Sequence, residues 1–321
     1  MTREILLESL KANLRVLSLE DFSKLFINEA QAIEEFYKLC HGISAGKTIS
    51  LLFNPHRLST VSIHNNCVRS IYDGLQQDAS LNGLARLYLY NLEHGVNNAF
   101  YSAVQRGFEG IPYINEFPPI VARNIVMQYG IDKRDKTVIK ILDPCAGWGG
   151  RMIGCASILN VSYTACEPST MTFNGLQKLG SWLKLLQPSF SFDVKCLPYE
   201  DLECNEQFDI ALTSPPYYDT EHYSDEPTNS LNRYKSFDDW VEGFYKPLIL
   251  TTMERVKDDG VFILNVGDRK YPLSQSMFKV CEDAGLYCSR IRDYLSGNGE
   301  GKEKFYCISK KQKIATHNKL F

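Results

Sequence analysis

Two short turns, 71 residues apart from Asp143 to Ser214, carry the residue types with the clearest chemical meaning. The first is DPCAGWGG at 143–150, where glycines at 147, 149 and 150 allow a tight turn and a close approach of the backbone to a ligand. If a helix begins there, its free N–H groups favour a ligand carboxylate. A tight strand-to-helix turn without a ligand is the alternative interpretation.

The second turn is TSPPYY at 213–218. An exocyclic amine on a base is a poor nucleophile, because its lone pair is delocalised into the ring. The Ser214 oxygen and the Pro215 carbonyl can accept the two N–H groups of such an amine and free the lone pair. Pro215 and Pro216 stiffen the backbone, and Tyr217 can stack on the base. Catalysis would then rest on positioning and electrostatics, whereas the alternative is a proline-stiffened surface turn.

Acidic residues follow two other predicted strands. Glu167 lies 24 residues after Asp143, where an acid can bind both hydroxyls of a ribose. Glu200 or Asp201, in CLPYED, can accept a hydrogen bond from an adenine amino group. For Glu167 the alternative is a solvated charge at a strand end.

The elements that must position these residues alternate along the chain. We expect strands at 138–142, 161–166, 190–197, 208–213 and 261–266, helices at 149–160, 169–186, 237–257 and 274–285, and a final hairpin of 286–291 and 304–309 around GNGEGK. This order predicts an open parallel sheet with helices on both faces. The strands at 138–142 and 208–213 should be neighbours at the topological switch point, so the two turns should meet.

The first 110 residues differ from the rest, because apolar residues recur there at helical spacing near 4–18, 21–40 and 81–106. A turn-rich connection follows at 106–119. We therefore expect an N-terminal helical region at 1–110, serving target recognition or oligomerisation, a catalytic domain at 115–310 and a basic tail at 311–321.

The residues at 115–310 resemble the amino-group (N6-adenine or N4-cytosine) DNA methyltransferases, including phage and bacterial members. DPCAGWGG resembles their cofactor motif, SPPY their catalytic motif, and EFPP at 116–119 the element that places a Phe, here Phe117, over the cofactor. The resemblance implies a Rossmann-like α/β fold, doubly wound and mostly parallel, with S-adenosyl-L-methionine as cofactor. It implies a catalytic turn of Ser214, Pro215, Pro216 and Tyr217, and cofactor contacts from Phe117, Asp143, Cys145, Gly147, Gly149, Glu167, Glu200 and Asp201.

The sequence departs from that family after the catalytic turn, where no large insertion offers room for a target-recognition domain. The loop YDTEHYSDEP holds four acids, which are unfavourable beside a phosphate backbone. Two roles are open for this loop: capping the site, or gripping substrate through Arg233 and Lys235. Further along, NVGDRKYP at 265–272 is either a polar turn or part of the base pocket, with Arg269 and Lys270 near phosphate. The substrate-binding candidates are Tyr218, His222, Arg233, Asn265 and Asp268, although His222 can equally be a plain loop histidine.

Bulk properties leave the substrate open. The net charge of −3 and the pI of about 6.1 are not those of a strongly basic nucleic-acid binder. The ten cysteines form no CxxC pair, and we expect neither a metal site nor a membrane span. We expect the protein to lie in the reducing cytoplasm of a bacterium or of a phage-infected host, where it would belong to a restriction-modification system. Ser214 favours cytosine N4 over adenine N6. RNA, a free nucleotide, or an inactive nucleic-acid-binding subunit remain as alternatives to an enzyme acting on DNA.

Overall fold

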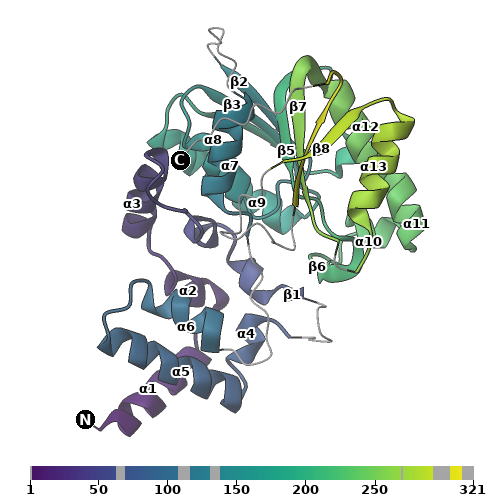
Figure 1. Ribbon diagram of the computed structural model, residues 1–321. Helices are drawn as coiled ribbons and strands as arrows, with labels where there is room; N and C mark the ends of the chain where they lie inside the picture. Colours follow the sequence, from purple (N-terminus) through teal and green to yellow (C-terminus); the bar gives the residue numbers. More distant parts are fainter. Residues whose placement is uncertain are drawn as a thin grey trace.

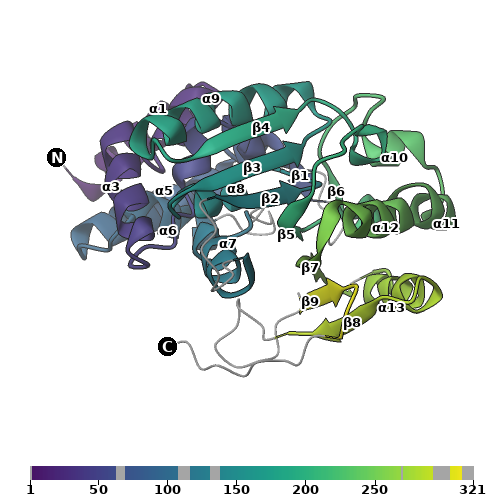
Figure 2. The same ribbon diagram turned by 90° about the horizontal axis from the view of Figure 1, so that it is seen from above.

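A seven-stranded sheet organises the protein (Figures 1 and 2). The computed structural model describes residues 2–62, 69–107, 116–130, 138–268, 270–291 and 304–312. The strand order is β4-β3-β2-β5-β7-β9-β8. The strand bounds are β2 Ile139–Asp143, β3 Val161–Cys166, β4 Ser191–Lys195, β5 Phe208–Thr213, β7 Val256–Val266, β8 Tyr287–Arg290 and β9 Lys304–Ser309.

The first five strands of that order run parallel, and β9 is antiparallel to both β7 and β8. This confirms the predicted Rossmann-like, doubly wound, mostly parallel α/β sheet with a C-terminal antiparallel hairpin. The GNGEGK turn of that hairpin and the tail beyond residue 312 lie outside the described residues. Strand β7 begins at Val256, five residues earlier than expected, because Val256 is fully buried and pairs with Phe208.

Helices cover both faces of the sheet, and alternate strand residues serve the two cores. Ile141 and Ile263 pack on one face, and their neighbours Leu142 and Phe262 on the other. The first face is covered by α7 Pro119–Ile125, α8 Gly150–Ala156 and α9 Thr170–Leu186, and the second by α12 Lys246–Arg255 and α13 Leu273–Asp283. The single helix predicted over 237–257 is three segments, namely α11 Phe237–Trp240, a π-helical turn Val241–Tyr245 and α12.

The N-terminal region is mostly helical, as predicted. Its helices are α1 Arg3–Arg15, α2 Leu19–Lys24, α3 Glu29–Cys40, α4 Ile71–Gly74, α5 Asp78–Glu93 and α6 Ala99–Gly107. The expected helices at 21–40 and 81–106 are each interrupted. Asn28 forms a capping box that starts α3, and left-handed backbone at Gly95 and Asn98 separates α5 from α6.

The N-terminal region contributes to two hydrophobic cores, one within the region itself and one shared with the sheet. Most of its helices pack around Phe22, Leu84 and Phe100. In contrast, α3 and the 3₁₀ turn Ile49–Leu52 join the core beneath α7 and α8, through Phe36 and Ile49. Figure 1 shows α3 beside α7 and α8, above the lobe formed by α1, α2 and α4–α6. None of the described helices has the length and apolarity of a membrane span.

Candidate functional site

The two chemically informative turns are joined to each other. Strands β2 and β5 are parallel neighbours, with Leu142 opposite Ala211. Beyond their carboxyl ends, the Cys145 N–H donates to Thr213 Oγ1 at 3.1 Å, and Thr213 Oγ1 donates to Asp143 Oδ1 at 2.7 Å. The prediction that the turns meet at the switch point is confirmed.

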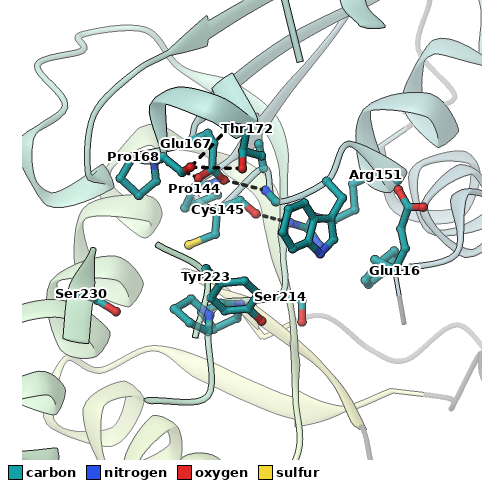
Figure 3. A pocket seen from close by; sticks show the side chains of 18 of the residues that line it. Glu116, Pro144, Cys145, Arg151, Glu167, Pro168, Thr172, Ser214, Tyr223 and Ser230 are labelled. Atoms are coloured by element: carbon teal, nitrogen blue, oxygen red, sulfur yellow. Dashed lines mark hydrogen bonds between the residues drawn. The ribbon is translucent and has the colours of Figure 1, made fainter. Parts of the chain in front are cut away.

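Both turns open on one cavity of about 610 Å³ (Figure 3). This volume is within the ordinary range for small-molecule and cofactor sites. Ten of the predicted site residues line it: Phe117, Cys145, Gly147, Glu167, Glu200, Ser214, Pro215, Pro216, Tyr217 and Asn265.

Asp143 does not reach the cavity. It is fully buried behind the glycine turn, where Oδ2 accepts hydrogen bonds from Arg151 Nε and the Tyr163 hydroxyl, both at 2.7 Å. Its Oδ1 also accepts from the Cys145 N–H at 3.2 Å. The expected cofactor contact therefore does not match its placement, because buried donors occupy the carboxylate. Asp143 instead fixes the shape of the turn.

The glycines of the turn have different tasks. Gly147 has a φ of 56° and lines the cavity, so it provides the close approach to a ligand. Gly149 has a φ of 99° and lies outside the cavity wall. A Cβ on Gly149 would lie 2.5 Å from Leu179 Cδ2, so this glycine allows α8 to pack against α9.

Glu167 lines the cavity from the end of β3. Its carboxylate accepts hydrogen bonds from the Gly147 N–H at 3.1 Å and the Ser169 N–H at 3.0 Å. Burial raises the pKa of Glu167 to about 7, against the lowering effect of these two bonds. The group is thus a buried acceptor that is linked to the glycine turn and titrates near neutrality.

Of the two neighbouring acids after β4, Glu200 lines the cavity and Asp201 points away. Asp201 accepts two hydrogen bonds from Arg233, at 2.8 and 3.0 Å. Glu200 Oε1 accepts from the Tyr234 hydroxyl at 3.1 Å, while Oε2 is buried without a hydrogen-bond partner among the described residues. Burial raises the pKa of Glu200. The structure therefore brings Glu200 to the site and pairs Asp201 with Arg233 outside it.

The catalytic-turn candidates Ser214, Pro215, Pro216 and Tyr217 all line the cavity, and Figure 3 labels Ser214 on its wall. Tyr218, predicted to bind substrate, does not line it. Its φ of 53° is left-handed, which is costly for a residue with a side chain. Its hydroxyl donates to the Lys235 carbonyl at 3.1 Å, and its ring packs on Tyr271. Tyr218 therefore anchors the turn from outside.

The acidic loop after the turn covers the cavity. We call residues 218–230 the cap loop, and six of them line the cavity: Thr220, Tyr223, Ser224, Thr228, Asn229 and Ser230. Glu226 accepts hydrogen bonds from Thr170 N at 3.0 Å and Thr170 Oγ1 at 2.9 Å, at the start of α9. Of the two roles considered for this loop, capping is the one that its position supports.

The cap loop is also tied to the N-terminal region. Strand β6 (Glu221–His222) pairs antiparallel with β1 (Val61–Ser62). The His222 side chain is partly exposed and lies 3.2 Å from Asp225 Oδ1, outside the cavity wall. His222 therefore lies beside Asp225 in the cap loop, outside the cavity.

The polar segment 265–272, which begins at the end of β7, matches the two interpretations in different parts. Asn265 is buried, lines the cavity and donates to the Lys304 carbonyl at 3.2 Å. Asp268 accepts from the Ser274 N–H at 2.8 Å and so caps the start of α13. Lys270 pairs with Asp219 at 2.6 Å, and position 269 lies outside the described residues.

Sequence reasoning missed the cavity residues supplied by the N-terminal region. Lys47, Arg57 and Tyr101 all line the cavity. In addition, Asn54 Nδ2 donates at 3.0 Å to the carbonyl of Trp148, a residue of the glycine turn. These contacts join residues far apart in the chain, so no local pattern could reveal them.

Arg151 and Glu116 were also missed, although Arg151 left a signal. A cation in the first turn of a helix is disfavoured by the helix dipole, yet Arg151 is the second residue of α8. It pairs with Asp143, and its Cζ lies 5.2 Å from the centroid of the Phe117 ring. A misplaced buried cation of this kind indicates a nearby buried carboxylate.

Comparisons with known proteins add no functional assignment. No family model and no curated protein sequence matches the chain. A Listeria monocytogenes protein described as a class I S-adenosylmethionine-dependent methyltransferase aligns at 12% identity and a TM-score of 0.45, over 90% of this chain and 91% of that protein. A methyltransferase from Pyrococcus furiosus aligns at 14% identity and a TM-score of 0.41, over 70% and 95%. Similarity at this level does not establish a function for the chain.

Proposed function

We propose that this chain is an S-adenosylmethionine-dependent methyltransferase that methylates an exocyclic amino group of a nucleic-acid base, either cytosine N4 or adenine N6 in DNA. The observation that carries this proposal is the convergence of two strand-end turns on one cavity. Glu167 and Glu200, which follow β3 and β4, bring carboxylates to that cavity beside the glycine turn, and the Ser-Pro-Pro-Tyr turn brings amine-accepting oxygens.

The residues present fit the cofactor. Glu167 would accept hydrogen bonds from the ribose hydroxyls, as an acid at the end of the second strand does in dinucleotide sites. Glu200 Oε2 is a buried acceptor without a partner among the described residues, and an adenine amino group would supply the missing donor. When bound, S-adenosylmethionine supplies the methyl group as an activated sulfonium.

The catalytic turn acts by holding the amine. Ser214 and the Pro215 carbonyl accept its two N–H groups and free the nitrogen lone pair for attack. Tyr217 holds the base by stacking, worth about 1–3 kcal/mol per base. No strong base is needed, because the proton leaves after the methyl group has arrived, so turnover depends on positioning.

The direct test is product identification. Unmethylated DNA would be incubated with the protein and S-adenosylmethionine, digested to nucleosides and analysed by mass spectrometry. We expect N4-methylcytosine or N6-methyladenine, formed about 10- to 100-fold more slowly by the Tyr217→Ala variant. Cofactor binding by calorimetry is measured first, because a chain that does not bind S-adenosylmethionine is not this enzyme but a methyltransferase-like binding subunit.

A second candidate keeps the chemistry but replaces DNA with RNA or a free nucleotide. The charges near the cap loop favour it, because Arg233 is paired with Asp201 and Lys270 with Asp219. These pairs leave less positive charge for a duplex. Salt titration separates a nucleic acid from a free nucleotide, since binding of a polyanion weakens steeply with salt and binding of a single nucleotide changes little. The same product analysis with RNA in place of DNA separates the two nucleic acids.

A further inference from the structure

Glu116 is a cavity-lining residue outside both turns, and it carries a buried acceptor without a hydrogen-bond partner among the described residues. Its side chain is 3% exposed and lines the cavity, and Figure 3 labels it beside Arg151. Oε2 accepts from the Ser50 hydroxyl at 2.5 Å and from Arg57. Oε1 is buried and has no hydrogen-bond partner among the described residues. Buried carboxylate oxygens in proteins normally accept a hydrogen bond, so Oε1 lacks a donor.

The free oxygen lies directly over the glycine turn. A Cβ built on Gly150 would lie 2.8 Å from Glu116 Oε1 and 2.2 Å from the Phe117 carbonyl oxygen. Only a residue without a side chain at position 150 permits this approach. The acceptor therefore packs against Gly150 at the start of α8, and Gly150 itself lines the cavity.

The two nearby arginines do not supply the missing donor. Arg57 Nη1 binds Oε2 of Glu116. Arg151 donates to Asp143 at 2.7 Å and to the Cys145 carbonyl, on the other side of the turn. The strongest hydrogen bonds to a carboxylate oxygen come from cationic N–H donors.

We propose that Glu116 Oε1 accepts a hydrogen bond from the α-ammonium group of the cofactor, and that Ser50 and Arg57 of the N-terminal region position it. This rests on the proposed function, because it deepens the description of the same site. Burial raises the pKa of Glu116, and an incoming ammonium would favour the charged form. The N-terminal region then contributes to cofactor binding through Ser50 and Arg57, independently of any contribution to target recognition.

Three thioether ligands that differ only at the amino-acid end provide the test, with binding to the full-length chain measured by calorimetry. S-adenosylhomocysteine has both ammonium and carboxylate, S-adenosyl-3-thiopropylamine has the ammonium alone, and methylthioadenosine has neither. In the Glu116→Gln variant, the amide oxygen can still accept from Ser50 and Arg57. We expect this variant to bind the first two ligands about 10- to 100-fold more weakly and methylthioadenosine within about threefold of wild type.

The matched control is Glu203→Gln, the same change at an exposed glutamate, which should bind all three ligands as the wild type does. An equal loss for methylthioadenosine would overturn the proposal by revealing a structural role, as would unchanged binding of S-adenosylhomocysteine. A loss confined to S-adenosylhomocysteine would overturn it too, because Glu116 would then sense the carboxylate.

If Glu116→Gln does not fold, Glu116→Asp serves instead, because it keeps the charge near Arg57 but withdraws the oxygen from Gly150. The same ligand pattern is expected for it. If the wild type binds none of the three ligands, the proposed function itself fails, and that result is distinct from failure of the Glu116 assignment.

Discussion

Lowering the pH through 7 should weaken ligand binding and at the same time stabilise the protein, because both effects depend on Glu167. Its pKa is raised from 4.5 to about 7 by burial. At 1.36 kcal/mol per pH unit, this difference corresponds to about 3 kcal/mol between the protonated and ionised forms. The folded state therefore binds this proton more tightly than the unfolded state does.

This preference sets the direction in which the free energy of unfolding changes with pH. Above pH 7, Glu167 is ionised in both the folded and the unfolded state, and the folded protein bears the full free-energy cost of burying the charged carboxylate. As the pH falls from 8 to 5 the penalty is relieved, so the free energy of unfolding should rise by up to about 3 kcal/mol from this group. Ribose hydroxyls need the ionised carboxylate as acceptor, so affinity should fall about tenfold per pH unit below 7, or about 100-fold at pH 5.

The assay is calorimetric binding of methylthioadenosine from pH 5 to 8, beside urea unfolding at the same pH values. This ligand has no group that titrates in that range. The Glu167→Gln variant should show a flatter profile in both measurements. Glu116 and Glu200, whose pKa values burial also raises, are retained in the variant, so the difference between the two proteins isolates Glu167. Parallel profiles for wild type and variant would refute the reasoning.

Three further changes test the site. Tyr217→Ala should lower kcat/KM by about 10- to 100-fold through lost stacking while leaving S-adenosylmethionine affinity near wild type by calorimetry, and a loss of cofactor binding instead would contradict this role. Gly150→Ala should destabilise the protein by about 1–3 kcal/mol in urea unfolding, because the new Cβ would lie 2.2 Å from the Phe117 carbonyl oxygen; an unchanged midpoint would count against that close approach. Glu226→Gln should speed amide hydrogen exchange in the cap loop by about fivefold, since Thr170 loses its charged acceptor, and equal protection in both proteins would mean that other contacts hold the loop.

The fold and the meeting of the two turns could be predicted because both follow from local patterns. Short apolar runs alternating with helical periodicity define a parallel sheet, and chain order then makes β2 and β5 neighbours. Ser214 and Glu167 were found in this way, because a residue at the carboxyl end of a central strand points to the same edge whatever surrounds it.

Which acids face the cavity was not predictable in the same way. Asp143, Asp201 and Asp268 occupy motif-like positions, yet each is held elsewhere: Asp143 by Arg151, Asp201 by Arg233, and Asp268 by the start of α13. A carboxylate turns toward its strongest donors, and these donors are brought close by the packing of other segments.

The sequence by itself determined the sheet, its two chemical turns and the expectation of a ligand between them, because these depend on periodicity and on the conformational limits of glycine and proline. Only the tertiary structure decided that the N-terminal region completes the cavity. The Arg57–Glu116 pair spans 59 residues and is buried on both sides. Burying charge in this way is favourable only when both partners arrive together, and that condition belongs to the folded chain.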